Sequence, residues 1–211
     1  MNNNEKKDCS NTINISFTLS REYNYKIFFD NYINLKSAEF TFRILTIQNN
    51  EVKFESNGEF FSKNDKYKIS TDDITYYYND KLLYSIITDD KEINIYDMSK
   101  VEMSNDNILF KSINPKELIV FLKKHYSYEL IPNQKNETYT LFFTNDSKPD
   151  YEVIFNSKFE IKSIKIINKK STFSNVLFFE NIKTDIEIDN DKLEINIESY
   201  KDFFINQLWK Y

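Results

Sequence analysis

The apolar residues of this chain repeat with a period of two, and short polar turns interrupt them. Phe40, Phe42 and Ile44 alternate with polar residues, which is the spacing of a strand with one buried face. Similar runs follow at 52–60, 67–70, 74–78, 82–87, 93–96, 128–130, 138–144, 151–155, 161–168, 173–182 and 193–197. Polar turns such as Gln48-Asn49-Asn50-Glu51 separate the early runs. Consecutive short strands joined by tight turns predict an antiparallel meander.

Two segments instead have helical spacing. The first, about residues 20–36, begins at Ser20, a suitable helix cap, and its apolar stripe consists of Tyr25, Phe28, Phe29, Tyr32 and Ile33. The second begins at Asn114-Pro115, where proline suits the first helical turn, and its stripe consists of Leu118, Ile119, Phe121, Leu122 and Tyr126. Each stripe predicts a helix with one apolar face.

These patterns predict a mainly β (α+β) fold. A sheet of about eleven antiparallel strands must curl or close, so we expect a curved, unclosed half-barrel with two or three helices in or over its concave face. No Pro/Gly/Ser-rich linker divides the chain, so we expect a polar arm over 1–19, with a possible short strand at 13–19, and one domain over 20–211. Residues 99–113 are irregular, and the tail at 200–211 is interpreted as a helix or an edge strand.

The composition of the chain narrows the classes of function that it fits. The chain has 19 phenylalanines, 15 tyrosines and one tryptophan, but one glycine, one histidine and one cysteine. Aromatic side chains supply large apolar area, whereas the groups that usually perform catalysis are nearly absent. The net charge of −5 argues against a nucleic-acid binder. No apolar run is long enough to cross a membrane, and the polar N-terminus predicts no signal peptide.

The order of motifs resembles the outer-membrane lipoprotein carrier proteins, the LolA-like family. After the first helix come Ala-Glu-Phe-Thr-Phe at 38–42, a short hairpin, Asn-Gly-Glu-Phe at 57–60 and Asn-Asp-Lys-Tyr-Lys-Ile at 64–69. Asn-Asp-Lys-Leu-Leu-Tyr at 79–84, Lys-Glu-Ile-Asn-Ile at 91–95 and Asn-Pro-Lys-Glu-Leu at 114–118 follow. The resemblance covers about residues 21–205, and the chain's one glycine, Gly58, falls where the family has its strand glycine.

The chain also departs from the family pattern. Asn79-Asp80 stands for the hairpin Asp-Gly, Tyr84 stands for a tryptophan, and Asn64 lies near the place of the arginine that is associated with closing the lid. The family works in the periplasm, so the lack of a visible signal is a further departure. These differences concern the release of cargo more than the fold.

The candidate site is a lipid-binding cavity on the inner face of the sheet. Its expected lining is Phe40, Phe42, Phe60, Tyr67, Ile69, Tyr76, Tyr78 and Tyr84. The expected lid helices contribute Phe28, Phe29, Tyr32, Leu118, Phe121 and Leu122. Any one of the strand side chains, taken alone, is better explained as ordinary core. As a set they offer more apolar face than two short helices can cover, and an uncovered inner face is a ligand cavity.

Other polar groups give no catalytic pattern. His125 follows two lysines at a helix end, where a cation favours the helix dipole, and Cys9 has no histidine partner in sequence reach. The acidic pairs Asp72-Asp73, Asp89-Asp90 and Asp189–Asp191 lie in expected turns, where aspartate is common. We therefore expect no enzyme, no cofactor and no metal.

The resemblance implies a periplasmic carrier that shields the acyl chains of lipoproteins between the inner and outer membranes. Its implied partners are those acyl chains, an inner-membrane lipoprotein-releasing transporter and an outer-membrane acceptor, and we expect a monomer that binds no nucleic acid. Two alternatives stay open. One is a non-catalytic β-domain for protein interaction with a fully packed core, and the weaker one is a lipid-modifying enzyme.

Overall fold

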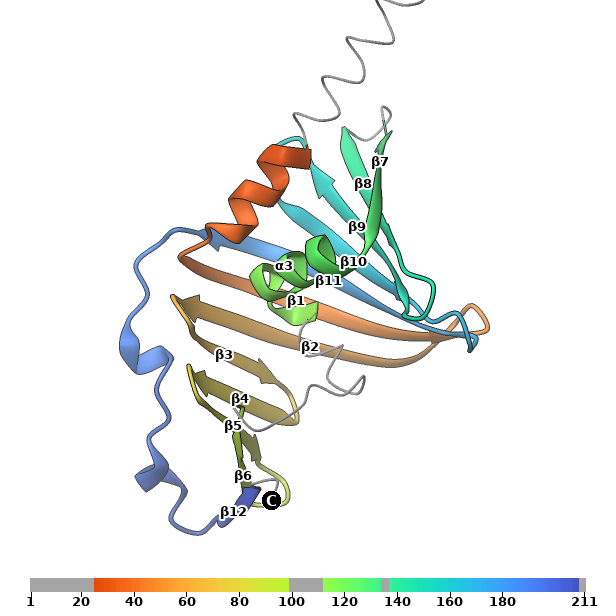
Figure 1. Cartoon of the computed structure of the whole chain (residues 1–211). Helices are drawn as coiled ribbons and strands as arrows, with labels where there is room; N and C mark the ends of the chain where they lie inside the picture. Colours follow the sequence, from red (N-terminus) through yellow and green to blue (C-terminus); the bar gives the residue numbers. More distant parts are fainter. Residues whose placement is uncertain (1–24, 99–111, 134–136, 209–211) are drawn as a thin grey trace, which may run out of the picture.

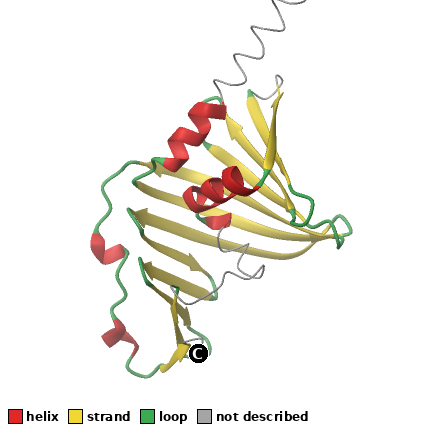
Figure 2. Cartoon of the chain, viewed as in Figure 1, coloured by secondary structure: helices red, strands yellow, loops and turns green. Residues whose placement is uncertain are grey.

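The computed structural model of the chain describes residues 25–98, 112–133 and 137–208, and these build one large open sheet with helices against it (Figures 1 and 2). The strands are β1 (Ser37–Gln48), β2 (Glu51–Lys63), β3 (Lys66–Thr71), β4 (Ile74–Asn79), β5 (Leu82–Ile87), β6 (Glu92–Asp97), β7 (Ser127–Asn133), β8 (Thr138–Thr144), β9 (Asp150–Asn156), β10 (Ile161–Ile167), β11 (Phe173–Thr184) and β12 (Phe204–Leu208). The helices are a segment over 25–33, α3 (Pro115–His125) and two short 3-10 turns, η2 (Asn190–Lys192) and η3 (Ile197–Tyr200).

The sheet has twelve strands in the order β12-β6-β5-β4-β3-β2-β1-β11-β10-β9-β8-β7. Two antiparallel meanders, β1 to β6 and β7 to β11, join through the pairing of β1 with β11 at the centre. The sheet does not close into a barrel, and the helix over 25–33 and α3 lie against one face of it (Figure 1). The mainly β, half-barrel fold expected from the sequence is therefore confirmed, with one parallel pair, β6 with β12, in addition.

The turns take left-handed backbone without glycine. Asn49 and Asn50, between β1 and β2, have φ of 52° and 65°, and Asn64 and Asp80 in the next hairpins have φ of 56° and 76°. Asparagine and aspartate are the residues other than glycine that tolerate this region best, because their short polar side chains bond locally. This tolerance lets a chain with one glycine make tight hairpins.

Some element predictions differ from the structure. The expected strand at 193–197 is wrong, because this stretch is irregular and leads into η3. The tail forms an edge strand, β12, rather than a helix. The expected cap Ser20, the arm at 1–19 with its possible strand at 13–19, Cys9, and most of the irregular 99–113 lie outside the described residues.

The apolar surface of the sheet changes face along its width. Over β1 to β3 and β7 to β11, buried side chains point toward the two helices and form one large core. Over β4 to β6, a second cluster of Tyr84, Ile86, Ile93 and Ile95 lies on the opposite face. The chain after β11 covers this cluster, with Ile195, Tyr200 and Phe203 packed against it. Both faces of the sheet are therefore buried, but in different places.

Candidate functional site

Most of the side chains expected to line a cavity meet in the large core. Phe40, Phe42, Phe60, Tyr67 and Ile69 are all at most 5% exposed, and Tyr76 and Tyr78 pack at the margin of the same core. They come from β1 to β4, on the face toward the helices. Alternation along each strand explains this placement, because Phe40 pairs with Phe60, Phe60 with Ile69, and Ile69 with Tyr76.

Tyr84 is the exception and corrects the expected lining. It pairs with Tyr77, whereas Tyr76 pairs with Ser85, so Tyr84 faces away from Tyr76 and Tyr78. It belongs to the second cluster, under the chain that follows β11. The hairpin between β4 and β5 sets this register, and a one-residue difference decides the face.

The sequence reasoning missed the contribution of the second meander. The large core also contains Leu141, Phe143, Tyr151, Val153, Phe155, Ile161, Ile164, Leu177 and Phe179. Their alternation, for example Tyr151, Val153 and Phe155 on β9, carries the same signal as that of β1. Both meanders therefore build the face that the helices cover.

The helix over 25–33 plugs the wide end of this face with aromatic rings. Phe28 stacks on Phe155 with ring centroids 4.3 Å apart, and Phe29 meets Phe143 edge-on at 6.3 Å. The hydroxyl oxygen of Tyr32 accepts a hydrogen bond of 2.8 Å from the backbone N–H of Ile161. Burial raises the pKa of Tyr32 above its ordinary value of 10.0, so this hydroxyl stays protonated.

Helix α3 covers the middle of the same face. The Asn114 side chain accepts from the N–H of Glu117 and Pro115 opens the helix, as the sequence predicts. Leu118, Ile119 and Leu122 are at most 1% exposed, and burying each stabilises the closed arrangement by about 1.5–3 kcal/mol. Phe121 packs at the margin of the core.

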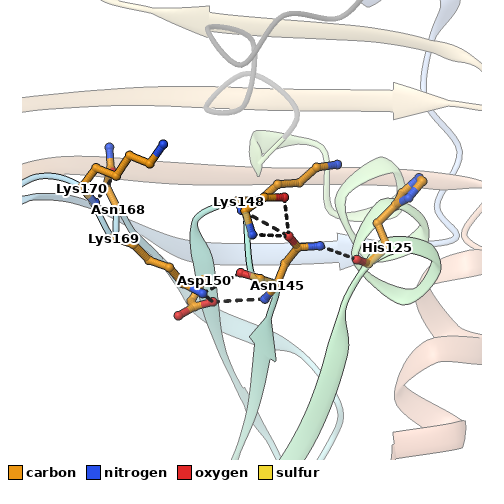
Figure 3. Close-up of polar contacts among 8 residues, drawn as sticks. His125, Asn145, Lys148, Asp150, Asn168, Lys169 and Lys170 are labelled. Atoms are coloured by element: carbon orange, nitrogen blue, oxygen red, sulfur yellow. Dashed lines mark hydrogen bonds and ion pairs between the residues drawn. The ribbon is translucent and has the colours of Figure 1, made fainter.

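The two helices also touch each other and a neighbouring turn. The ammonium group of Lys123 on α3 lies 4.9 Å from the ring centre of Phe29. At the end of α3, the amide of Asn145 donates a 2.9 Å hydrogen bond to the backbone oxygen of His125 (Figure 3). The C-terminal end of α3 is thereby tied to the turn between β8 and β9.

Beneath the helices the rings of the sheet stack on one another. Phe40 stacks on Phe60 at 4.6 Å and Tyr67 on Tyr78 at 4.8 Å, with Phe179 edge-on to Phe40. Burial raises the pKa of Tyr67 and of Tyr78, and the charge of Glu117 acts in the same direction. These rings of the sheet therefore pack directly against one another.

Two pockets lie at the margins of the lid helices, and both contain Leu35. One, of about 290 Å³, lies between the N-terminus of α3 and the sheet margin and includes Asn64, Tyr67, Tyr78 and Glu117. The other, of about 440 Å³, flanks the helix over 25–33. Tyr32, Phe159 and Ile182 line it together with polar and charged residues that include Asp30, Lys158 and Glu160. Asn64 therefore lines the same pocket as Asn114 and Glu117 at the start of α3.

Among residues 25–98, 112–133 and 137–208, no group of three or more His, Cys, Asp and Glu side chains is placed to hold a metal ion. His125 ends α3 with its ring 5.0 Å from that of Phe121, as part of the helix end. No helix in the described part of the chain is long and apolar enough to cross a bilayer.

Comparison with known proteins identifies the fold through structure rather than sequence. Neither a protein-family model nor a curated protein matches the chain. An uncharacterized conserved protein from Thermus thermophilus is similar over 88% of this chain and 99% of its own, with a TM-score of 0.57 and 7% identity.

Two further matched structures carry the family name reached from the sequence. A LolA superfamily protein from Nitrosomonas europaea covers 83% of this chain and 98% of its own, with a TM-score of 0.44 and 8% identity. A putative outer membrane lipoprotein-sorting protein domain from Vibrio parahaemolyticus covers 87% and 97%, also at 0.44 and 8%. The LolA superfamily is thus represented among the matches, and likeness at these identities concerns the fold alone.

Proposed function

We propose that this chain is a non-enzymatic carrier that shields the acyl chains of lipoproteins between its sheet and the two lid helices. One observation carries the proposal: within the residues that the structure describes, the large apolar face of the sheet is covered by two short helices and not by a second sheet. The proposal requires these two helices to move away from the sheet, against the side-chain packing that holds them there.

In the arrangement described here the lid helices fill the space that cargo would take. Phe28 and Leu118 are at most 1% exposed and belong to the same large core as Phe40 and Phe60. Loading then exchanges helix side chains for alkyl chains, and each methylene moved out of water stabilises the complex by about 0.8 kcal/mol. The proposed place of entry is the pocket beside the helix over 25–33, at its apolar residues Leu35, Phe159 and Ile182.

The partners and compartment follow from the family resemblance. The proposal is that an inner-membrane lipoprotein-releasing transporter loads the carrier in the periplasm, and that an outer-membrane acceptor receives the cargo. Release needs a better site for the acyl chains, since a closed apolar site otherwise retains them.

Uptake of a fluorescent fatty acid by the purified protein tests the proposal, with native mass spectrometry to find co-purified lipid. The informative variant is Tyr32→Phe, which removes the acceptor of the Ile161 N–H and loosens the helix over 25–33. We expect uptake several-fold faster than in the natural protein. Tyr200→Phe, in the second cluster on the other face, is the matched control and should leave uptake unchanged.

A second candidate is a packed β-domain for protein interaction. The close stacking of Phe28 on Phe155 and of Phe40 on Phe60 favours it, because stacked rings leave little room between them. It predicts that Tyr32→Phe lowers stability and that neither protein takes up lipid. A folded protein without any uptake would decide for this candidate and against the carrier.

A further inference from the structure

The two edges of the sheet differ in how they are protected. At one edge, β7 carries Glu129 and Pro132, a charge and a residue without an N–H, both of which hinder pairing with another strand. At the other edge, β12 reads Phe-Ile-Asn-Gln-Leu, without charge, proline or glycine. Exposed uncharged edge strands pair readily with other chains, so β12 is the edge open to a partner.

Three of the four exposed side chains of β12 are apolar, the fourth being Gln207, and side-chain hydrogen bonds tie the strand to β6. Phe204 is 71% exposed, Ile205 43% and Leu208 44%. The amide of Asn206 donates to Glu92 Oε1 at 2.6 Å and to Asn94 Oδ1 at 3.1 Å. β12 is therefore a fixed strand that displays apolar surface.

The backbone of β12 has a defined free side. The N–H of Phe204 donates to the backbone oxygen of Lys91 at 2.8 Å, and β12 runs parallel to β6 in a continuous register. In a strand, the N–H and C=O of one residue point to the same side, and those of the next residue point to the opposite side. Since the N–H of Phe204 points to β6, the N–H and C=O groups of Ile205 and Gln207 point away from β6. In the described part of the chain no strand pairs with that side.

We propose that this free side binds β12 of a second copy of the chain, antiparallel and centred on Asn206. Ile205 then lies opposite Gln207 of the second copy and exchanges both backbone hydrogen bonds with it, and the symmetric pair does the same. Phe204 lies opposite Leu208 of the second copy, so apolar side chains meet on one face. This register requires the backbone groups of Ile205 and Gln207 to point away from β6, as they do.

Charge and symmetry favour a second copy as the occupant. The strand is uncharged, so no like charges face each other across the two-fold axis, as they would if a charged strand paired with itself. A two-fold contact closes on itself, and the protected β7 edge stops further growth. The proposed product is a dimer with one continuous sheet, whereas the sequence led us to expect a monomer.

Five residues per strand make a small contact, so we expect a weak dimer. Interfaces below about 1,200 Å² usually belong to weak or transient complexes. Sedimentation velocity on the full chain tests this. Between about 1 µM and about 1 mM protein, the range of dissociation constants expected for a weak complex, it should show a concentration-dependent dimer.

Gln207→Pro is the decisive variant, because it removes an N–H group that points away from β6. The N–H groups of Phe204 and Asn206, which point toward β6, are kept. It should weaken the dimer at least tenfold, whereas Gln207→Ala, which keeps the N–H, should not. Ile205→Lys places two lysines near the two-fold axis and should weaken it as well, without depending on a proline in the strand.

Amide hydrogen exchange in the natural protein gives an independent readout. Protection of the amides of Ile205 and Gln207 should rise with protein concentration, while that of Glu129 on the other edge stays constant. A chain that stays monomeric over the whole concentration range overturns the proposal. Binding of a foreign peptide to β12 would not rescue it. A dimer that survives both Gln207→Pro and Ile205→Lys overturns it too.

Discussion

The one glycine of the chain, Gly58, lies where no side chain has room. It pairs with Phe42 on β1, and a Cβ atom added to it would clash with the Phe42 ring and with the backbone oxygen of Ser70. The ring can turn, but the carbonyl belongs to the neighbouring strand β3. Glycine is therefore required by packing, and its φ is not positive.

Gly58→Ala should lower the free energy of unfolding by about 1–3 kcal/mol, the usual cost of overpacking a core. Urea denaturation measures it, with Asn57→Ala on the other face of β2 as the control. Equal stability of the two variants would contradict the close approach of Phe42 and Ser70.

At Asp80 the opposite change should help. Its φ of 76° is left-handed, which costs a residue with a Cβ about 1 kcal/mol or more, and the Tyr78 hydroxyl bonds only to its backbone oxygen. Asp80→Gly should raise the free energy of unfolding by about 0.5–1 kcal/mol. A thermal melt checks this, and a lower melting temperature would show that the aspartate side chain contributes more than its backbone strain costs.

At the scale of elements, α3 depends on the turn between β8 and β9. Asn145 Oδ1 accepts from the N–H groups of Ser147 and Lys148 at 3.0 and 3.2 Å, while its amide holds the His125 oxygen (Figure 3). One side chain therefore shapes the turn and anchors the helix end.

Asn145→Ala should cost about 1–2 kcal/mol, because it removes several hydrogen bonds of about 0.5–1.5 kcal/mol each. Hydrogen exchange should become faster in α3 in particular. Asn168→Ala is the matched control: its Oδ1 accepts from the Lys170 N–H at 3.0 Å in another turn, without the link to α3. Unchanged exchange in α3 would mean that its apolar contacts alone hold it.

Elements were predictable where local signals agree. Hairpins such as Gln48 to Glu51 carry turn residues between alternating strands, and the Asn114 cap with Pro115 marks the start of α3. The stretch at 193–197 alternates too, yet it forms no strand, because its apolar residue Ile195 covers the second cluster instead. Alternation indicates that one side of a segment is buried. Tertiary contacts decide whether that segment forms a strand.

At the scale of the molecule, buried tyrosines make stability depend on alkaline pH. Burial raises the pKa of Tyr126 to about 12, with a smaller contribution from Asp150, and burial also raises the pKa of Tyr32, Tyr67 and Tyr151. Below the ordinary pKa of 10.0, folded and unfolded chains both keep these protons. Above it the unfolded chain ionises first, so stability falls.

The slope should approach about 1.4 kcal/mol per pH unit for each such tyrosine between the two pKa values. Urea midpoints between about pH 8 and about pH 11 should stay level and then drop, with tyrosinate absorbance appearing as the chain unfolds. Tyr126→Phe should make the drop shallower. A constant midpoint up to the highest pH would contradict the burial of these hydroxyls.

The sequence allowed us to predict which side chains of the candidate site share a face of the sheet, but not how much room is left between that face and the helices. Alternation placed Phe40, Phe60 and Ile69 on one side correctly, whereas Tyr84 depended on a register that the turn decides. How completely the lid helices fill the face follows from ring orientations, such as Phe28 on Phe155, which no periodicity contains.

The pairing of β1 with β11 has a consequence for synthesis of the protein. β1 ends at Gln48 and its partner in the sheet at that point is Phe173, so the first meander leaves the ribosome long before its neighbour exists. Its β1 edge and the apolar patch that Phe203 later covers stay open meanwhile. Long-range strand pairing is slow and prone to aggregation, so the first meander is exposed to aggregation until translation is nearly complete.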